Sequence, residues 1–173
     1  KTVGPSTLNI WTSNNTNTIL EALVNYEKTF GSHDLKVLAG TSVEQTSNKG
    51  LEGYRNTFPN NALYQLGAGD ASTATNNSSL EEYALVSFFG RVNYAFKDKY
   101  LLEANLRYDG SSRFAKDNRW GIFPSVSAGW RISEENFWKN TRAGEVVNNL
   151  KLRASYGVLG NQNIGVYPYQ QTY

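Results

Sequence analysis

Long runs of two-residue alternation limit the fold of this chain more than any other feature. From Ala84 to Phe96 the even positions are apolar or aromatic, whereas the odd positions are mostly polar. Successive side chains of a β-strand point to opposite faces of a sheet, so this period indicates a strand with one apolar face. Five further runs alternate in the same way. We therefore expect six strands, over residues 19–30, 34–45, 83–96, 100–109, 120–131 and 149–158.

The length of these runs separates two kinds of β protein. Each run has about ten residues or more, which is what a tilted strand needs to cross a bilayer. Strands of soluble proteins typically have about 5–6 residues. No run of about 18 apolar residues is present, so the sequence contains no transmembrane helix. We expect an all-β fold that is a segment of a transmembrane antiparallel β-barrel.

The connection at Lys97–Lys99 predicts how two of the strands pair. A three-residue loop places Phe96 opposite Tyr100 and keeps both apolar faces on one side, whereas a two-residue loop would mix the faces. The polar face then points into the barrel. The charged residues that we expect to face the lumen are Arg91, Glu103, Arg107, Arg131, Lys151 and Arg153. Arg91 should lie diagonal to Glu103. These charges either form cross-strand pairs in a wet interior or steer a solute and hold a plug domain.

The connections alternate between short and long. Residues 31–34 and 97–99 are expected to be tight turns, and 46–82 and 110–119 long polar loops. Outer-membrane barrels have short periplasmic turns and long extracellular loops. The 132–148 connection lies on the short-turn side, where Ser133 is suited to be the N-cap of a short helix. Six strands are too few for a barrel, which needs about eight. Residues 1–16 and 159–173 resemble loops cut from neighbouring strands, and the first residues lack the apolar core of a signal peptide, so we expect an internal segment.

Aromatic residues concentrate at the expected strand ends. Rings with polar tips favour the boundary between lipid and water, and two such girdles flank the apolar band of an outer-membrane barrel. The girdle candidates near the short turns are Tyr26, Phe30, Tyr94, Phe96, Tyr100 and Trp130, and those near the long loops are Tyr108, Trp120 and Tyr156. Pro124 lies inside an expected strand and cannot donate to the ladder, so we expect a bulge or a local break there.

The expected loops supply candidates for contact with a substrate. Aromatic rings together with Arg, Asn and Asp side chains can bind sugars or peptides by stacking and hydrogen bonding. The candidates are Tyr54, Arg55, Phe58, Arg113, Phe114, Asp117, Asn118 and Arg119. The alternative is that these side chains fold the loops onto one another.

No residue pattern in the sequence indicates catalysis. The chain has no Cys and a single His, His33, which we expect to be exposed in a turn. One His cannot form a metal site by itself, and no cofactor motif is present. Glu81–Glu82 and Glu134–Glu135 are expected to be solvated charges, because neighbours in a strand point to opposite faces. The net charge of +2 is small and the basic residues are scattered, which argues against nucleic-acid binding.

Contiguous motifs resemble one known family. The segments that carry the resemblance are YLLEANLRYDGSSRFAKDNRWGIFPSVSAGWRISEENFW (100–138), LKLRASYGVLGNQNIGVYPYQ (150–170), FFGRVNYAFKDKY (88–100) and FPNNALYQLGAG (58–69). They are similar to the barrel of the SusC/RagA family of TonB-linked outer-membrane proteins of Bacteroidota.

This resemblance implies a parent barrel of about 22 strands, of which this chain supplies about six. It also implies an N-terminal plug, which the chain does not carry. The implied function is import of oligosaccharides or peptides across the outer membrane of a Gram-negative bacterium, with a SusD-like lipoprotein as lid and TonB–ExbB–ExbD as energy source. Two alternatives stay open: a soluble β-rich carbohydrate-binding module, and an outer-membrane barrel that does not transport.

Overall fold

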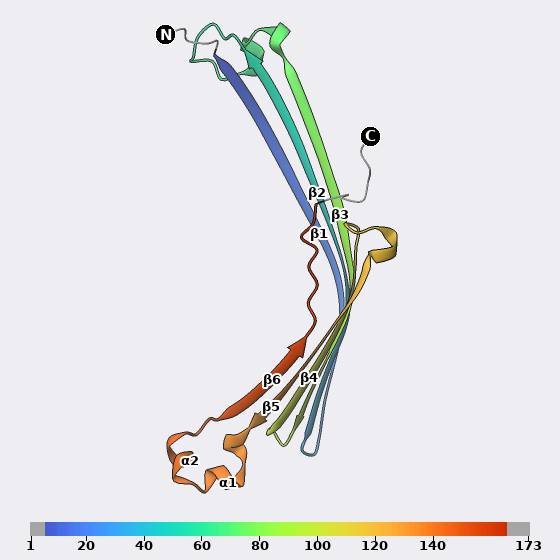
Figure 1. Ribbon diagram of the computed structural model, residues 1–173, viewed down its shortest axis with the longest axis vertical. Helices are drawn as coiled ribbons and strands as arrows, with labels where there is room; N and C mark the ends of the chain where they lie inside the picture. The colour runs from blue at the N-terminus through green and yellow to red at the C-terminus, as the bar shows by residue number, and fades with distance from the viewer. Residues whose placement is uncertain (1–5, 166–173) are drawn as a thin grey trace. The chain divides into compact units, whose positions relative to one another are not determined.

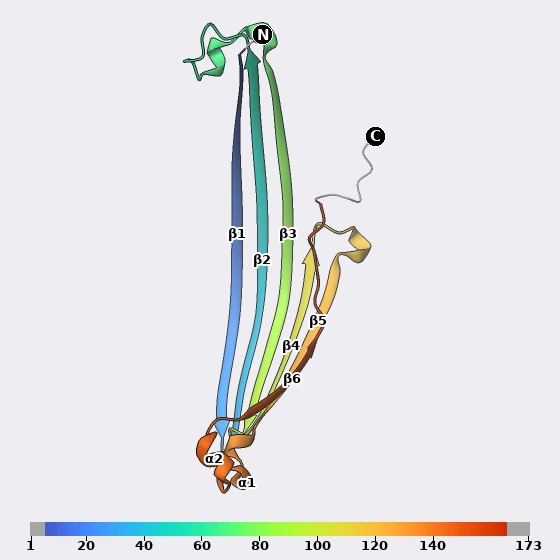
Figure 2. The ribbon, with the colours of Figure 1, turned by 60° about the vertical axis from the view of Figure 1, so that its left-hand side comes forward.

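The computed structural model describes residues 6–165 of the chain and consists mainly of one antiparallel sheet (Figures 1 and 2). The sheet order is β1-β2-β3-β4-β5-β6, so each strand pairs with its neighbour in sequence. The strands are β1 (Thr7–Phe30), β2 (His33–Asn56), β3 (Thr75–Phe96), β4 (Tyr100–Ser111), β5 (Trp120–Arg131) and β6 (Lys151–Gly157). The chain divides into two compact units, residues 1–18 with 45–83 and residues 19–44 with 84–173. Among the described residues, no helix is long and apolar enough to cross a membrane.

The pairing of β3 with β4 confirms the register expected from the alternation. Phe96 lies opposite Tyr100, and Arg91 lies opposite Asn105 and therefore diagonal to Glu103. The next ladder pairs Tyr100 with Trp130, which again joins even positions to even positions. The apolar sides of β3, β4, β5 and β6 consequently share one face.

The first three strands are longer than expected, and the long loop is correspondingly shorter. β1, β2 and β3 have 24, 24 and 22 residues, about twice the length that a bilayer crossing needs. The expected loop 46–82 was wrong over residues 46–56 and 75–82, which belong to β2 and β3. Residues 7–16, expected to be a cut loop, also form a strand. The expected loops at 1–5 and 166–173 lie outside the described residues.

The other boundaries differ by small amounts. β5 covers the expected range 120–131, whereas β4 extends through Ser111 into the expected loop 110–119. The first turn contains only Gly31 and Ser32, so His33 already belongs to β2. β6 is shorter than the expected 149–158.

Pro124 lies in β5 without a bulge on the β4 side. Its Cα partner is Leu106, and the register continues unchanged on both sides of this pair. The missing N–H is directed toward β6, since the Pro124 carbonyl accepts a hydrogen bond from Val158 N at 2.9 Å and the two groups of one residue point to the same neighbour. The β6 ladder ends next to it, at Ser125 and Gly157. The expected bulge was therefore wrong, and a break occurs only where β6 ends.

The helical elements are short, and three of the six described lie between β5 and β6. Four are 3₁₀ turns: η1 (Leu66–Ala68), η2 (Ala71–Thr73), η3 (Lys116–Asn118) and η4 (Ile132–Glu134). The α-helices are α1 (Asn136–Lys139) and α2 (Arg142–Val146), which lie at the same end of the second unit as its tight turns (Figure 1). Ser133 was wrong as the N-cap. It is buried in η4, and the capping side chain is that of Thr141, which accepts from Gly144 N.

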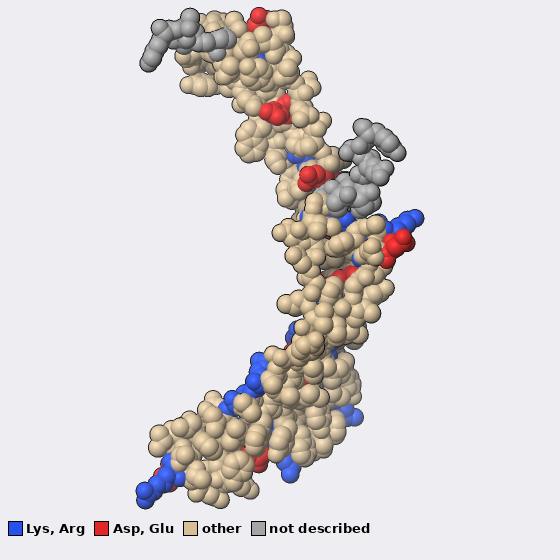
Figure 3. Space-filling model, viewed as in Figure 1, with Lys and Arg blue, Asp and Glu red and all other residues tan. Residues whose placement is uncertain are grey.

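No hydrophobic side chain among the described residues is buried. The most buried side chain is that of Ser87, at 1% exposure, whereas apolar-face residues such as Ile122 and Leu152 are about 60% exposed. Most of the surface drawn in Figure 3 is uncharged. A surface with this many large exposed apolar residues marks a site of contact with another protein or with a membrane.

The glycine at position 110 allows an aromatic stack on the apolar face. The Trp120 ring lies over Gly110, so that an added Cβ would meet ring atoms at 2.7 Å. The same ring stacks on Tyr108 at a centroid distance of 4.6 Å and faces Phe88 at 6.3 Å. The glycine therefore permits an aromatic ladder across three strands.

We predict that Gly110→Val displaces Trp120 from Tyr108 and destabilises the folded protein by about 1–3 kcal/mol, because the added side chain overpacks the stack. Trp120 fluorescence and the denaturant midpoint measure the two effects. Gly67→Ala is the control, since nothing lies within 4 Å of a Cβ at that position. An unchanged midpoint in Gly110→Val would show that the stack contributes no stability.

Candidate functional site

A pocket of about 510 Å³ lies where the β4–β5 loop meets the segment that follows β6. Strands β4 and β5 contribute Arg107, Asp109 and Phe123, whereas Phe114, Asn118 and Arg119 come from the loop. The segment after β6 contributes Leu159, Gly160, Asn161 and Gln162. We call this the loop-end pocket. Its lining combines aromatic rings with a guanidinium, a carboxylate and amides, which is the composition of a site for a polar organic ligand.

Two polar atoms in this pocket have unused hydrogen-bonding capacity. Nε of Arg119 and Oε1 of Gln162 are buried and have no hydrogen-bond partner among residues 6–165. Buried polar atoms are almost always satisfied by protein, water or a ligand. An unused donor and an unused acceptor therefore belong to two side chains that line one pocket.

Other side chains of the pocket serve to hold it together. Arg107 donates to both carboxylate oxygens of Asp109 at 3.2–3.3 Å and to Ser87 Oγ at 3.2 Å, and its guanidinium lies 5.3 Å from the Phe89 ring centre. The Phe123 ring packs against Gly121 and Gly160. Glycine is needed at position 160, because a Cβ there would overlap the ring.

The loop itself is fixed by backbone contacts. Ser111 N donates to Arg119 O at 3.0 Å and Ser112 N donates to Ala84 O at 2.9 Å. Arg113 Nη1 donates to Ile164 O at 2.7 Å, which ties the loop to the segment after β6. The pocket walls are thus held without a ligand.

The structure brings only some of the predicted contact residues together. Phe114, Asn118 and Arg119 line the loop-end pocket, Arg113 supports it, and Asp117 is exposed on η3 outside the lining. Sequence reasoning missed Asn161 and Gln162, because residues 159–173 were expected to be a cut loop. The run of amides between Gly160 and Gly165 was the available signal.

Tyr54, Arg55 and Phe58 lie in the first unit, where two of them hold a loop in place. Arg55 Nη1 donates to Gly67 O at 3.5 Å and to Gly69 O at 3.2 Å, and the Phe58 ring packs against Gly69. Asp70 caps η2 by accepting from Ser72 N, and this hydrogen bond lowers the pKa of the Asp70 carboxyl. Tyr54 belongs to β2 rather than to the loop. The loop-folding alternative therefore accounts for Arg55 and Phe58.

The charges on the polar face are linked both by direct ion pairs, such as that of Arg107 with Asp109, and through amides. Arg91 Nε donates to Asn105 Oδ1 at 2.8 Å, and Asn105 Nδ2 donates to Glu103 Oε1 at 3.0 Å. Arg131 lies opposite Lys151 in the β5–β6 ladder. Glu103, Lys151 and Arg153 line a smaller groove of about 220 Å³.

Aromatic side chains form a row near the tight turns. His33 stacks on Phe30 at 5.1 Å and packs against Phe96 at 4.8 Å, and its Nδ1 is 2.7 Å from Tyr94 Oη. His33 is therefore half-buried within the row, and its expected exposure was wrong. Phe96 and Tyr100 continue the row at 6.4 Å.

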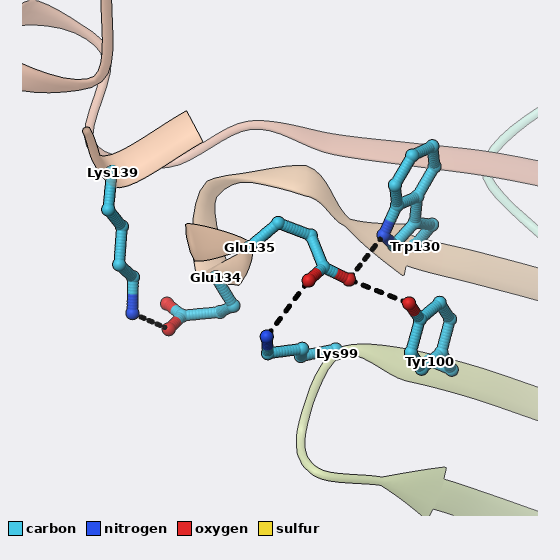
Figure 4. A network of polar contacts seen from close by, with 6 residues as sticks. All are labelled: Lys99, Tyr100, Trp130, Glu134, Glu135 and Lys139. Atoms are coloured by element: carbon cyan, nitrogen blue, oxygen red, sulfur yellow. Dashed lines mark hydrogen bonds and ion pairs between the residues drawn. The ribbon is translucent and has the colours of Figure 1, made fainter. Parts of the chain in front are cut away.

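Glu135 ends this row with a network of three donors (Figure 4). Its carboxylate accepts from Lys99 Nζ at 2.9 Å, Tyr100 Oη at 2.7 Å and Trp130 Nε1 at 3.2 Å. The hydrogen bond from Lys99 is the largest of the effects that lower the pKa of Glu135 to about 2. Its side chain is 14% exposed, so the expectation of a solvated charge was wrong for this residue. Glu134 is more exposed and pairs with Lys139, which lowers its pKa.

No group of three or more His, Cys, Asp or Glu side chains that could hold a metal ion occurs within residues 6–165.

We predict that Arg55→Ala loosens the loop of residues 57–74, because two carbonyl oxygens lose their donor. Limited proteolysis should then cut within this loop sooner than in the wild type. Lys49→Ala, a change of a basic residue within β2, is the control. Equal cleavage rates for Arg55→Ala and the wild type would mean that the guanidinium does not hold the loop.

We predict that Glu135→Gln makes the stability of the fold depend less on pH below about pH 5. The folded-state pKa is about 2 and the ordinary value is 4.5, so the carboxylate stabilises the fold above about pH 4.5 and this contribution is lost as the pH falls toward 2. Thermal midpoints between pH 5 and pH 2 should fall less in Glu135→Gln than in the wild type. Glu145→Gln, at an exposed acid of α2, should keep the wild-type slope. If the thermal midpoint of Glu135→Gln falls with pH as steeply as that of the wild type, Glu135 is not the source of this pH dependence.

Comparisons with known proteins agree with this architecture. The family described as TonB dependent receptor-like, beta-barrel matches residues 2–169. TonB-dependent receptor P3 of Formosa agariphila is 41% identical over 155 residues, which are 89% of this chain and 15% of that protein. TonB-dependent receptor SusC of Bacteroides thetaiotaomicron is 39% identical over 142 residues, 82% of this chain and 14% of that protein.

A solved structure described as the RagAB peptide transporter superposes with a TM-score of 0.82 at 27% identity, over 94% of this chain and 18% of that one. The chain thus spans about 15% of the curated relatives it matches. The six-stranded sheet and these matches together show that the chain belongs to the TonB-dependent receptor β-barrel family, of the SusC and RagA kind.

Proposed function

We propose that the parent protein imports oligosaccharide or peptide nutrients across the outer membrane of a Gram-negative bacterium. In this proposal a SusD-like surface lipoprotein covers the barrel, and TonB–ExbB–ExbD supplies energy through a plug domain. The family and the likeness to SusC and to the RagAB peptide transporter support it. This chain would contribute six barrel strands whose apolar face meets lipid and whose polar face meets the lumen.

The observation that carries a role for this chain is the loop-end pocket. Arg119 Nε is a buried donor and Gln162 Oε1 a buried acceptor, and both are unsatisfied within the described chain. In this proposal a ligand turns both side chains into the pocket that they line. The hydroxyl of a sugar and the amide of a peptide each combine a donor with an acceptor and so suit this pair. Phe114 and Phe123 add apolar surface on which a sugar ring or a peptide side chain can pack.

The polar face of the same strands fits a wet interior. Arg91, Glu103 and Asn105 satisfy one another, which leaves their charges balanced in the absence of a solute. A wall with balanced charges binds a polar solute only weakly, so the solute can pass along it. In this proposal Arg91, Glu103, Arg107, Arg131 and Arg153 have mainly structural roles, and the loop-end pocket makes the contact with substrate.

We predict that Arg119→Ala weakens substrate binding by about tenfold, which corresponds to the loss of one hydrogen bond to a charged donor. The measurement is binding and uptake by the full-length receptor, with maltooligosaccharides and a mixed oligopeptide pool as probes. Lys116→Ala is the matched control, because Lys116 is exposed on the same loop and does not line the pocket. Equal loss in both variants would assign the effect to the loop fold.

Fractionation and a TonB deletion separate the proposal from its alternatives. An importer is recovered in the outer membrane with a lipoprotein partner, and its uptake stops without TonB. A barrel that binds substrate but shows no TonB-dependent uptake would be a non-transporting barrel. A receptor that stays in solution without detergent would be a soluble binding module, and the importer proposal would fail.

A further inference from the structure

A groove of about 430 Å³ crosses the apolar face near the tight turns. The ladders place Leu102, Ala128 and Ala154 in one row across β4, β5 and β6. The next row toward the turns contains Tyr100, Trp130 and Leu152, and all three line the groove. Ala128 and Ala154, beside this row of larger side chains, make the floor of the groove, which we call the alanine groove.

The polar tips of the aromatic side chains that line the alanine groove already have hydrogen-bond partners. Tyr94 Oη lies 2.7 Å from His33 Nδ1. Tyr100 Oη and Trp130 Nε1 both donate to Glu135 at 2.7 and 3.2 Å. An occupant therefore gains nothing from a polar group placed there, and the groove selects a hydrocarbon chain.

The network at Glu135 also keeps the walls in place. Because one carboxylate holds both aromatic tips, the Tyr100 and Trp130 rings cannot rotate into the space between them without losing a hydrogen bond. Phe137 of α1 packs against Trp130 at a centroid distance of 6.2 Å and extends the wall beyond the strand. The groove is thus a preformed feature and not a gap between mobile side chains.

The position of the groove indicates what fills it. It is continuous with the exposed apolar face, which meets lipid if the proposed function holds, and on that function this inference rests. It lies at the short-turn end, which is periplasmic in outer-membrane barrels. Lys97 is exposed in the turn before Tyr100, so a phosphate above the groove would meet a cationic side chain. We propose that the alanine groove binds one acyl chain of a phospholipid from the periplasmic leaflet.

The test fills the groove in the full-length receptor. Ala128→Leu adds a branched side chain to the floor, and Ala154→Leu fills the same row from β6. Ala22→Leu is the matched control, since Ala22 is an exposed alanine on the apolar face of β1. Receptors purified in detergent are analysed by native mass spectrometry for retained phospholipid. We expect the wild type and Ala22→Leu to retain a phospholipid that both groove variants lose.

A second readout uses the indole in the wall. The receptor is placed in vesicles of phosphatidylglycerol and phosphatidylcholine whose acyl chains carry bromine. Quenching attributable to Trp130, from the difference between wild type and Trp130→Phe, should decrease in Ala128→Leu and Ala154→Leu. If Ala128→Leu does not fold, Ala154→Leu gives the answer.

Three results would overturn the inference. Equal phospholipid retention by wild type and groove variants shows that the lipid binds elsewhere. Retention of lipopolysaccharide in place of phospholipid assigns the groove to the other leaflet. If the wild type needs detergent but retains no phospholipid, the lipid site is ruled out and the importer proposal stands. If the receptor is soluble without detergent, both are ruled out.

Discussion

The register of the β-ladders is the constraint on which the rest of this structure depends. The described chain buries no hydrophobic side chain, so backbone hydrogen bonds and cross-strand contacts must hold it together. Even positions pair with even positions in the β3–β4, β4–β5 and β5–β6 ladders. A slip of one residue would move every apolar side chain to the polar face. The apolar surface and the alanine groove both follow from this single choice.

The alternation predicted this register but not the full length of the first strands. Residues 84–96 contrast apolar and polar faces because one face meets a nonpolar medium. Residues 46–56 lack that contrast, since Thr46, Asn48 and Glu52 alternate with residues that are also largely polar. A strand with water on both faces has no period-2 signal in its hydrophobicity. Sequence reasoning therefore found the part of β2 whose two faces differ in polarity. It took the remainder of β2 for a loop.

The candidate site was predictable only in part, because half of it is local and half is not. Phe114, Asn118 and Arg119 share one loop, so their composition alone indicated a binding surface. Asn161 and Gln162 reach the same pocket from about forty residues later in the chain, over the Phe123 ring that Gly160 accommodates. Conversely, Arg55 was a candidate on the same grounds of composition, but its guanidinium donates to the carbonyl oxygens of Gly67 and Gly69. Composition cannot distinguish a donor that is free from one that is already used.

Whether a polar group is free or already hydrogen-bonded also explains how one sheet presents different chemistry at different places. On the apolar face, Glu135 and His33 occupy the polar groups of Tyr94, Tyr100 and Trp130, and what remains exposed is hydrocarbon. In the loop-end pocket, Arg119 Nε and Gln162 Oε1 are buried without a hydrogen-bond partner, so a donor and an acceptor stay unused beside the pocket. The hydrogen bonds from Lys99, Tyr100 and Trp130 lower the pKa of Glu135 to about 2, so its carboxylate is charged at neutral pH and the aromatic tips stay occupied. Internal hydrogen bonding, as much as residue type, decides which surface of this barrel segment faces lipid and which can bind a polar solute.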